Sequence, residues 1–213
     1  MLYKLDDHDI WFPQPENAEP DGLLAVGGDL SPDRLVLAYS WGIFPWFSDE
    51  SPILWYSPHE RFVIFPDHLK ISKSMNQVLS SGVFKITYDQ SFNDVIKACA
   101  KIERKEQNGT WITNDMQKAY MALHQLGIAH SVEVWKQDEL VGGLYGVVIG
   151  KVFCGESMFS TVSNASKAAL IWLCRTMNFK MIDCQFHTPH LESMGAKFIT
   201  RKEYLRILQH EDN

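Results

Sequence analysis

Two acidic residues lie inside apolar runs that have the alternation of β-strands. Glu156 lies in the run 152–159, VFCGESMF, and shares one face of the predicted strand with a valine, a cysteine and a methionine. Asp183 lies in the run 180–186, KMIDCQF, where alternation puts Gln185 on the same face about 7 Å further along. A carboxylate buried alone is costly, so each acid must be paired, neutralised or turned towards a cleft. The alternative is that both acids are edge-strand charges that face water.

Aromatic residues concentrate early in the chain, where 43–47 reads IFPWF and 55–58 reads WYSP. These rings can form a small aromatic core, or a platform on which a nucleobase stacks. The nearby run 22–30, GLLAVGGDL, is rich in glycine, but it has neither the lysine of a G-x-x-x-x-G-K-[ST] loop nor the G-x-G-x-x-G spacing. A nucleotide-phosphate site is therefore not indicated there.

The cysteines lie far apart, each inside an apolar element, which is typical of reduced core thiols and not of disulfides. Cys184, His187 and His190 have a spacing that can ligate a metal, but this pattern is more often a surface loop over a core thiol. We therefore expect no metal site. The cysteines are Cys99, Cys154, Cys174 and Cys184.

The elements that must position these residues mix strands and helices without a strict βαβ alternation, which predicts the α+β class. The stretch 131–159 predicts three successive strands joined by tight turns, and these form the sheet on which the other elements are mounted. The pattern changes at Arg61, after a start rich in Pro, Gly and Trp. We predict a small turn-rich N-terminal domain, residues 1–60, and a larger domain, residues 61–213. Capping and periodicity predict helices within 33–40, 69–79, 91–99, 114–126, 164–177 and from 200 onwards.

The chain has 213 residues, a formal net charge of −6, and 46% hydrophobic residues. This composition is ordinary for a globular protein and unlike that of disordered chains. An acidic chain is not a non-specific duplex binder, so any nucleic-acid contact needs a local basic patch. With no basic-then-apolar leader and no run of about 18 apolar residues, we expect a soluble, cytoplasmic monomer that binds no membrane.

Several motifs follow one another between residues 11 and 208. They are GLLAVGGDLSP at 22–32, GIFPWF at 42–47, GTWIT at 109–113, EVW at 133–135, LVGG at 140–143, FCGESMF at 153–159, NASK at 164–167 and IDCQ at 182–185. Together and in this order they resemble the leucyl/phenylalanyl-tRNA:protein transferase family. The resemblance implies a small N-terminal domain packed on a C-terminal domain with the acetyltransferase-like (GNAT) mixed-sheet fold.

The resemblance also implies an activity. The family moves leucine or phenylalanine, and less readily methionine, from aminoacyl-tRNA to proteins that begin with arginine or lysine, and so marks them for the bacterial N-degron pathway. No metal or coenzyme is implied. An aminoacyl ester is already activated, and an α-amine with a pKa near ~8 is partly neutral, so the enzyme must mainly hold two partners and accept a proton.

The family's functional residues match positions of this chain. Trp46 matches the ring that stacks on the terminal adenosine, and Trp111 matches a second tryptophan at the site. Asp183 and Gln185 match the pair assigned to the amine and its proton, and Glu156 matches a residue that lines the pocket. The predicted slot for the leucyl or phenylalanyl side chain is lined by Leu144, which stands where methionine is familiar, and by Gly155, Ser157, Leu170, Leu173 and Ile182.

An acidic chain that binds tRNA must grip phosphates with a few local cations. We predict a basic patch made by Lys70, Lys73 and Lys85, extended by Arg104 and Lys105. For any one of these lysines, a solvated helix face is the alternative.

Two other functions stay open from the sequence alone. An acyl-CoA acetyltransferase on the same fold presents a glycine-rich turn to the pyrophosphate at a helix N-terminus, but the turn 160–166, STVSNAS, has no glycine. A non-catalytic module that binds peptides or RNA ends could use the same rings and carboxylates, and an activity assay separates it from an enzyme.

Overall fold

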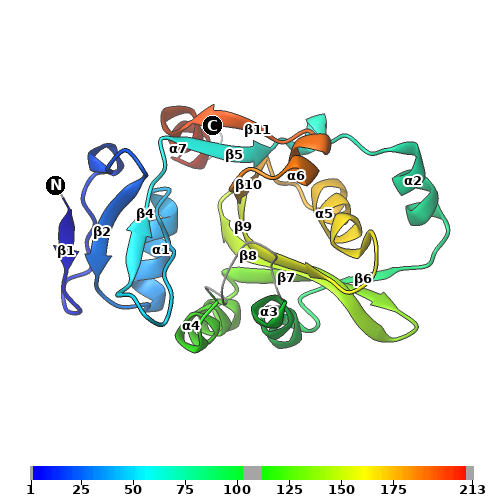
Figure 1. Cartoon of the computed structure of the whole chain (residues 1–213), viewed down its shortest axis with the longest axis horizontal. Coiled ribbons are helices and arrows are strands. Elements are labelled where there is room, and N and C mark those ends of the chain that lie inside the picture. The colour runs from blue at the N-terminus through cyan, green and yellow to red at the C-terminus, as the bar shows by residue number, and fades with distance from the viewer. Residues whose placement is uncertain (1, 103–111, 210–213) are drawn as a thin grey trace.

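The computed structural model describes residues 2–102 and 112–209 of the chain. Its strands form a smaller four-stranded sheet near the N-terminus and a larger seven-stranded sheet (Figure 1). The smaller sheet has the order β1-β2-β4-β3, in which β1 is parallel to β2 and the other pairs are antiparallel. Its strands are β1 Tyr3–Leu5, β2 Leu23–Gly27, β3 Phe44–Pro45 and β4 Leu54–Tyr56.

The larger sheet has the order β11-β5-β10-β9-β8-β7-β6. It is mixed, because β10 runs parallel to β9 while the other neighbours are antiparallel. Its long central strands occupy the stretch in which three successive strands were predicted. The strands are β5 Glu60–Ile64, β6 Lys85–Tyr88, β7 Ala129–Lys136, β8 Glu139–Ile149, β9 Val152–Ser160, β10 Met181–Gln185 and β11 Lys197–Thr200.

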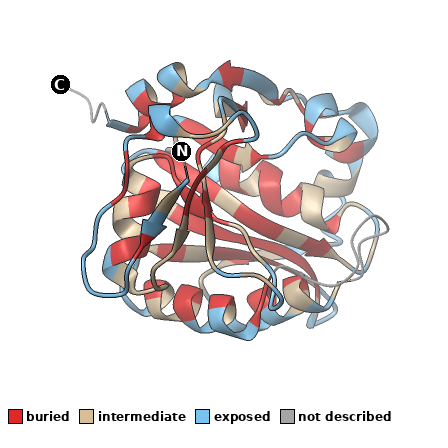
Figure 2. Cartoon of the chain, turned by 60° about the vertical axis from the view of Figure 1, so that its left-hand side comes forward, coloured by how far each residue is buried: buried red, intermediate tan, exposed pale blue. Residues whose placement is uncertain are grey.

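Helices cover both faces of the larger sheet: α3 and α4 pack on one face and α5 on the other (Figure 1). Helix α1 contacts β3, α4 and β8, so it joins the two sheets. Burial concentrates in the strands and on the sides of the helices that face them (Figure 2). This arrangement confirms the predicted α+β class. The helices are α1 Pro32–Ser40, α2 Lys73–Ser80, α3 Phe92–Lys101, α4 Asn114–Gln125, α5 Ala165–Thr176, α6 Pro189–Ser193 and α7 Arg201–Gln209, with short 3₁₀ turns at η1 Pro15–Asn17 and η2 Pro66–His68.

The helix predicted over 69–79 begins later than expected, at Lys73. The backbone N–H of Lys70 donates to the carbonyl of Met194 at 2.9 Å, which ties this segment to the chain after α6. Ser72 is the N-cap of α2, and its hydroxyl accepts from a backbone N–H of the first turn at 3.1 Å. The prediction was therefore wrong for the first turn, and Lys70 lies before the helix.

The cysteines are free thiols, as predicted for core positions. Three of them are buried, and Cys184 is half-buried. Within the described part of the chain, no helix is long and apolar enough to cross a membrane.

Strand β10 places the predicted acid and amide near the centre of the larger sheet, between β5 and β9. Asp183 lies opposite Val63 on β5 and Cys154 on β9, but the register with β5 shifts between Asp183 and Gln185. Gln185 has a φ of +59°, in the left-handed region that few residues other than glycine adopt. The predicted regular alternation is therefore wrong at Gln185, because the pairing of β10 with β5 shifts in register between the two residues.

Candidate functional site

A pocket of about 660 Å³ lies between the segment that carries β3 and the strands β8, β9 and β10. Helices α5 and α6 contribute the rest of its lining. Aliphatic and aromatic side chains form most of the wall, and the polar groups come from β9 and β10. A largely apolar cavity with a few convergent polar groups is the usual form of a small-molecule site.

Most of the residues predicted to line the side-chain slot do line this pocket, namely Leu144, Gly155, Ser157, Leu170 and Ile182. A Cβ atom at Gly155 would lie 3.2 Å from the carbonyl oxygen of Asp183, so glycine permits the close backbone approach. The prediction for Leu173 needs correction, because this side chain is fully buried in the core and does not line the pocket.

The carboxylate of Glu156 is the centre of a buried hydrogen-bond chain at one wall of the pocket. The amide nitrogen of Gln185 donates to Glu156 Oε1 at 2.8 Å, and the hydroxyl of Tyr120 donates to Oε2 at 3.0 Å. The hydroxyl of Tyr39 is hydrogen-bonded in turn to that of Tyr120. Glu156 and Gln185 are each only 7% exposed. The alternative of a water-facing edge charge is therefore wrong for Glu156.

Asp183 is fully buried, and its carboxylate forms an ion pair with Arg61 of β5. Its Oδ1 also accepts the backbone N–H of Gln185 at 2.9 Å. Arg61 donates to the carbonyl of Gly42 at 2.9 Å, and its guanidinium lies 4.8 Å from the ring centre of Phe44. The pair therefore joins the register shift in β10 to the segment that carries β3. The edge-charge alternative is wrong for Asp183 as well.

Burial opposes charge at Glu156 and at Arg61, with different outcomes. Burial raises the pKa of Glu156 to about 7, although its hydrogen bonds with the tyrosines and with Gln185 act in the opposite direction. Burial alone would lower the pKa of Arg61, but the charge and hydrogen bonds of Asp183 raise it above its ordinary value, so Arg61 stays protonated. Glu156 is therefore a carboxyl group that changes charge near neutral pH.

Replacement of Glu156 by glutamine should change how stability depends on pH. Its pKa is about 7 in the folded chain, against an ordinary value of 4.5, so the native state binds the extra proton between these values. The raised pKa of Glu156 therefore adds to the free energy of unfolding. This added stability is fully present below pH 4.5 and is lost as pH rises through 7. We expect the free energy of unfolding of the wild type, relative to Glu156→Gln, to fall by roughly 3 kcal/mol across this range.

Urea unfolding at a series of pH values measures this difference. Glu139→Gln, which alters an exposed glutamate at the start of β8, is the matched control and should track the wild type. Parallel stability curves for the wild type and Glu156→Gln would contradict the expected titration.

Trp46 lies at the pocket beside other rings. It is half-buried, and its ring centre lies 5.6 Å from that of Tyr56 and 5.2 Å from that of Phe186. Phe186 is 47% exposed and also contacts Phe44 edge-on at 6.1 Å. Neighbouring rings thus hold Trp46 while leaving part of it accessible. The other predicted tryptophan, Trp111, lies outside the described residues, as do Arg104 and Lys105.

Several residues of the site were not predicted from the sequence. Arg61 carried no signal beyond its place at the start of a strand, and Tyr39 and Tyr120 resembled ordinary core residues of their helices. Thr188 lines the pocket, and its hydroxyl accepts from the N–H of Leu191 at 3.2 Å as the N-cap of α6. A threonine followed by a proline is a recognisable helix start, so this cap was detectable. The lining residues that no sequence pattern had singled out are Phe153, Met158, Phe186 and Leu191, whereas Phe44 and Pro45 belong to the aromatic run 43–47, and Cys184 and His190 to the possible metal motif.

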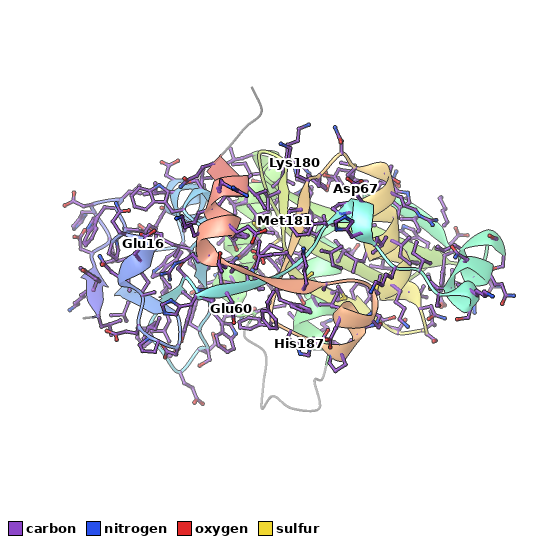
Figure 3. All side chains as sticks on the ribbon, turned by 90° about the horizontal axis from the view of Figure 1, so that it is seen from above. Glu16, Glu60, Asp67, Lys180, Met181 and His187 are labelled. Carbon is purple, nitrogen blue, oxygen red and sulfur yellow. The ribbon has the colours of Figure 1, made fainter. Side chains whose placement is uncertain are left out.

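The three residues of the possible metal motif lie apart. Cys184 and His190 line the pocket, whereas His187 stacks on Phe198 with ring centres 5.9 Å apart and lies 3.0 Å from the carboxylate of Glu192. Figure 3 shows His187 on the outside of the molecule, beside α6. Among the residues that the structure describes, no three His, Cys, Asp or Glu side chains are grouped as metal ligands.

Comparison with known proteins places the chain in a family. Residues 63–209 match the family model described as leucyl/phenylalanyl-tRNA protein transferase, and residues 28–59 match the model for the N-terminal domain of the same family. The chain is 54% identical to the leucyl/phenylalanyl-tRNA–protein transferase of Flavobacterium johnsoniae over 204 residues, which cover 94% of this chain and 96% of the relative. It is 55% identical to the protein of the same name from Syntrophus aciditrophicus over 203 residues, which cover 94% and 85%.

These matches define the class of protein as an aminoacyltransferase. The chain belongs to the leucyl/phenylalanyl-tRNA protein transferase family.

Solved structures give more distant similarities. A functionally unknown conserved protein from Staphylococcus epidermidis aligns with a TM-score of 0.48 at 10% identity, over 84% of this chain and 68% of that one. A GCN5-related N-acetyltransferase from Kribbella flavida aligns with a TM-score of 0.37 at 8% identity, over 78% and 60%. Both TM-scores lie below 0.5, and no conclusion about this chain rests on them.

Proposed function

We propose that this chain transfers leucine or phenylalanine, and less readily methionine, from aminoacyl-tRNA to the α-amine of proteins that begin with arginine or lysine. The product is then a substrate of N-degron degradation. One observation supports this proposal most strongly. The pocket combines an apolar wall at Leu144, Leu170 and Ile182 with the polar pair of Glu156 and Gln185, and with an accessible tryptophan ring at Trp46. Family membership supplies the reaction class that such a pocket would serve.

In this proposal the aminoacyl end of the tRNA fills the pocket. The leucyl or phenylalanyl side chain contacts the apolar wall, and the terminal adenine stacks on Trp46. The α-amine of the acceptor protein attacks the ester carbonyl, so a C–N bond forms and the ester C–O bond breaks. One amine proton leaves the nitrogen, and the 3′-oxygen of the tRNA gains a proton. Holding both reactants in this geometry supplies much of the rate.

Gln185 is the residue that we propose to orient the α-amine. Its amide nitrogen is committed to Glu156, so its carbonyl oxygen is the atom left to accept a hydrogen bond from the amine. Asp183 accepts the backbone N–H of Gln185 and already has Arg61 as its cationic partner. We therefore propose that Asp183 acts through Gln185 and does not bind the acceptor's basic side chain itself.

The division into a domain of residues 1–60 and a domain of residues 61–213 remains part of the proposal. The family models match on either side of this boundary, at 28–59 and 63–209. We further propose that the protein works as a monomer in the cytoplasm, with no metal or coenzyme.

Transfer is tested by incubating the protein with leucyl-tRNA and a peptide that begins with arginine, followed by mass measurement. A mass gain of one leucyl residue is expected for peptides that begin with arginine or lysine. No gain is expected for the same peptide with a glutamate first, or with an acetylated N-terminus. Equal gain for all four peptides would contradict the proposed acceptor specificity, and no gain for any would contradict the transfer itself.

The proposed tRNA patch gives a separate prediction. Lys70, Lys73 and Lys85 are all exposed, on the segment before α2, on α2 and on the edge strand β6. Lys70→Gln/Lys73→Gln should raise the KM for tRNA and reduce the slope of log affinity against log salt by about one unit per lost contact. Lys4→Gln, which alters an exposed lysine of β1, is the control. An unchanged slope would remove these two lysines from the tRNA site.

A further inference from the structure

Two buried tyrosines connect the N-terminal part of the chain to the acidic group of the pocket. Tyr39 lies on α1 and Tyr120 on α4, and their side chains are 1% and 0% exposed. Their ring centres are 6.5 Å apart in an edge-on contact, and their hydroxyl groups are hydrogen-bonded to each other. The hydroxyl of Tyr120 then reaches Glu156 Oε2 at 3.0 Å. Neither residue lines the pocket.

The direction of this hydrogen-bond chain follows from the number of protons available. A phenol has one proton to donate. Because the proton of Tyr120 goes to Glu156, the hydroxyl of Tyr39 must be the donor to Tyr120. Burial, followed by the nearby charge of Glu156, raises the pKa of both phenols well above the ordinary value, so both keep their protons. Every donor in the chain therefore points towards the carboxylate.

The charge of Glu156 decides which end of the Gln185 amide faces the pocket. An ionised carboxylate can only accept hydrogen bonds, so Gln185 must present its NH₂ group to it, as at the observed 2.8 Å. The amide carbonyl is then free for a donor in the pocket. A protonated Glu156 can instead donate to that carbonyl, and the amide would then turn its NH₂ group to the pocket. The second orientation would repel the α-amine that must be bound.

We propose that Tyr39 and Tyr120 are positioning residues for the transfer reaction, because they hold Glu156 as a carboxylate and thereby keep the carbonyl of Gln185 turned to the α-amine. This inference rests on the proposed function of the pocket. Glu156 then holds the side chain of Gln185, in addition to the contact of Asp183 with the backbone N–H of Gln185.

The surroundings of Glu156 make its charge sensitive to the loss of one donor. Its pKa of about 7 reflects burial opposed by the hydrogen bonds of Tyr39, Tyr120 and Gln185, and the charge of Asp183 raises it further. The thiol of Cys154 on the same strand is kept neutral, because burial raises its pKa. The guanidinium of Arg61 is bound to Asp183. The tyrosines are therefore, with Gln185, the groups that favour the charged form directly.

The same hydroxyl pair links the two parts of the chain that would hold the two substrates. Helix α1 ends at Ser40, a few residues before the segment that carries Trp46. Strands β9 and β10 carry Glu156 and Gln185. The hydrogen bond between Tyr39 and Tyr120 thus joins the side of the proposed adenosine platform to the side of the proposed acceptor.

The test is the pH dependence of kcat/KM for an arginine-initial peptide with leucyl-tRNA, in Tyr39→Phe and Tyr120→Phe. Loss of a donor should raise the pKa of Glu156, so the acidic limb of the profile should move up by about half to one pH unit. Both variants should show this shift, because the hydrogen bonds of both phenols favour the charged carboxylate. Rates should return to within about twofold of wild type at high pH, with an unchanged KM for leucyl-tRNA.

Two measurements separate this role from a purely structural one. The carboxyl ¹³C resonance of Glu156 should titrate at a higher pH in both variants, by the same amount as the rate profile. Tyr88→Phe, which alters a half-buried tyrosine of β6 that stacks on His130, should move neither the resonance nor the profile.

Three outcomes would overturn the inference. One is an acidic limb of the kcat/KM profile that stays at the wild-type pH in tyrosine variants that still transfer leucine. Another is a loss of rate that is equal at every pH and follows a lower melting temperature. The third is a Glu156 resonance that titrates as in the wild type. If the wild type itself transferred no leucine or phenylalanine, the proposed function would fail, while the resonance would still test whether the tyrosines control the charge of Glu156.

Discussion

Asp183→Asn is expected to lower kcat for leucyl transfer by about 100-fold or more, with little change in the KM for aminoacyl-tRNA. Asp183 has no exposed surface, and its carboxylate holds both Arg61 and the backbone N–H of Gln185. Asparagine keeps the shape but leaves the guanidinium without its counter-charge. The left-handed backbone at Gln185 then loses its charged acceptor, and the amide that orients the α-amine becomes misplaced. Steady-state kinetics with both substrates varied measures the effect.

The experiment must distinguish misplacement of Gln185 from unfolding of the protein, because breaking a buried ion pair costs about 3–5 kcal/mol of stability. Gln185→Ala leaves the pair of Arg61 and Asp183 intact and should lower kcat by a similar factor. The double variant Asp183→Asn/Gln185→Ala should be no worse than the more severe single change, since both remove the same function. Independent, multiplying losses would show that Asp183 does not act through Gln185. A near-normal kcat with an acceptor KM raised many-fold would show that Asp183 binds the acceptor instead.

Trp46→Ala is expected to weaken binding of the aminoacyl-adenosine end by about 5- to 150-fold, which corresponds to about 1–3 kcal/mol of stacking. Contacts with Tyr56 and Phe186 hold the ring in place, so it needs little ordering when a base stacks on it. Titration with an aminoacyl-adenosine whose ester is replaced by an amide measures the affinity. Trp46→Phe should recover much of the loss.

Trp11→Ala is a suitable control, because Trp11 is 39% exposed in the same part of the chain and does not line the pocket. It should leave the affinity unchanged. A loss of stability in Trp46→Ala, with normal affinity in the folded fraction, would support the alternative that Trp46 is only a core residue.

The sequence was sufficient to place single residues on the right elements. The alternation around Glu156 predicted a carboxylate among apolar neighbours on a strand, and it lies there, buried at the pocket. Leu170 and Leu173 lie on the helix predicted over 164–177, and the family resemblance placed both at the slot. Both are buried, but only Leu170 reaches the pocket, because the cavity extends along part of α5 and the remainder packs as core. Periodicity distinguishes inside from outside, and it does not show where a core is hollow.

The partners of the acidic residues could not be predicted, because they come from distant parts of the chain. Arg61 and Asp183 are 122 residues apart in sequence, and they meet only because β5 pairs with β10 in the sheet. Tyr39 and Tyr120 are 81 residues apart and meet where α1 packs on α4. Such pairings depend on strand order and helix packing, which local propensity does not encode.

The register shift in β10 also could not be predicted from the alternation of the sequence. A left-handed backbone is expected at glycine or asparagine, and glutamine gives no such signal. The conformation at Gln185 is held by its contacts with Asp183 and Glu156, so it is a property of the assembled site. Residues of this kind, strained and held by their surroundings, are concentrated at functional sites.

The proposed aminoacyl site is tested most directly by a crystal structure of the protein bound to leucyl-adenosine in which the reactive ester is replaced by an amide. We expect the leucyl side chain against Leu144, Leu170 and Ile182, the adenine on the ring of Trp46, and the carbonyl of Gln185 facing the space beside the reactive carbon. An analogue bound elsewhere, or one whose leucyl group lies outside this pocket, would contradict the assignment of the site.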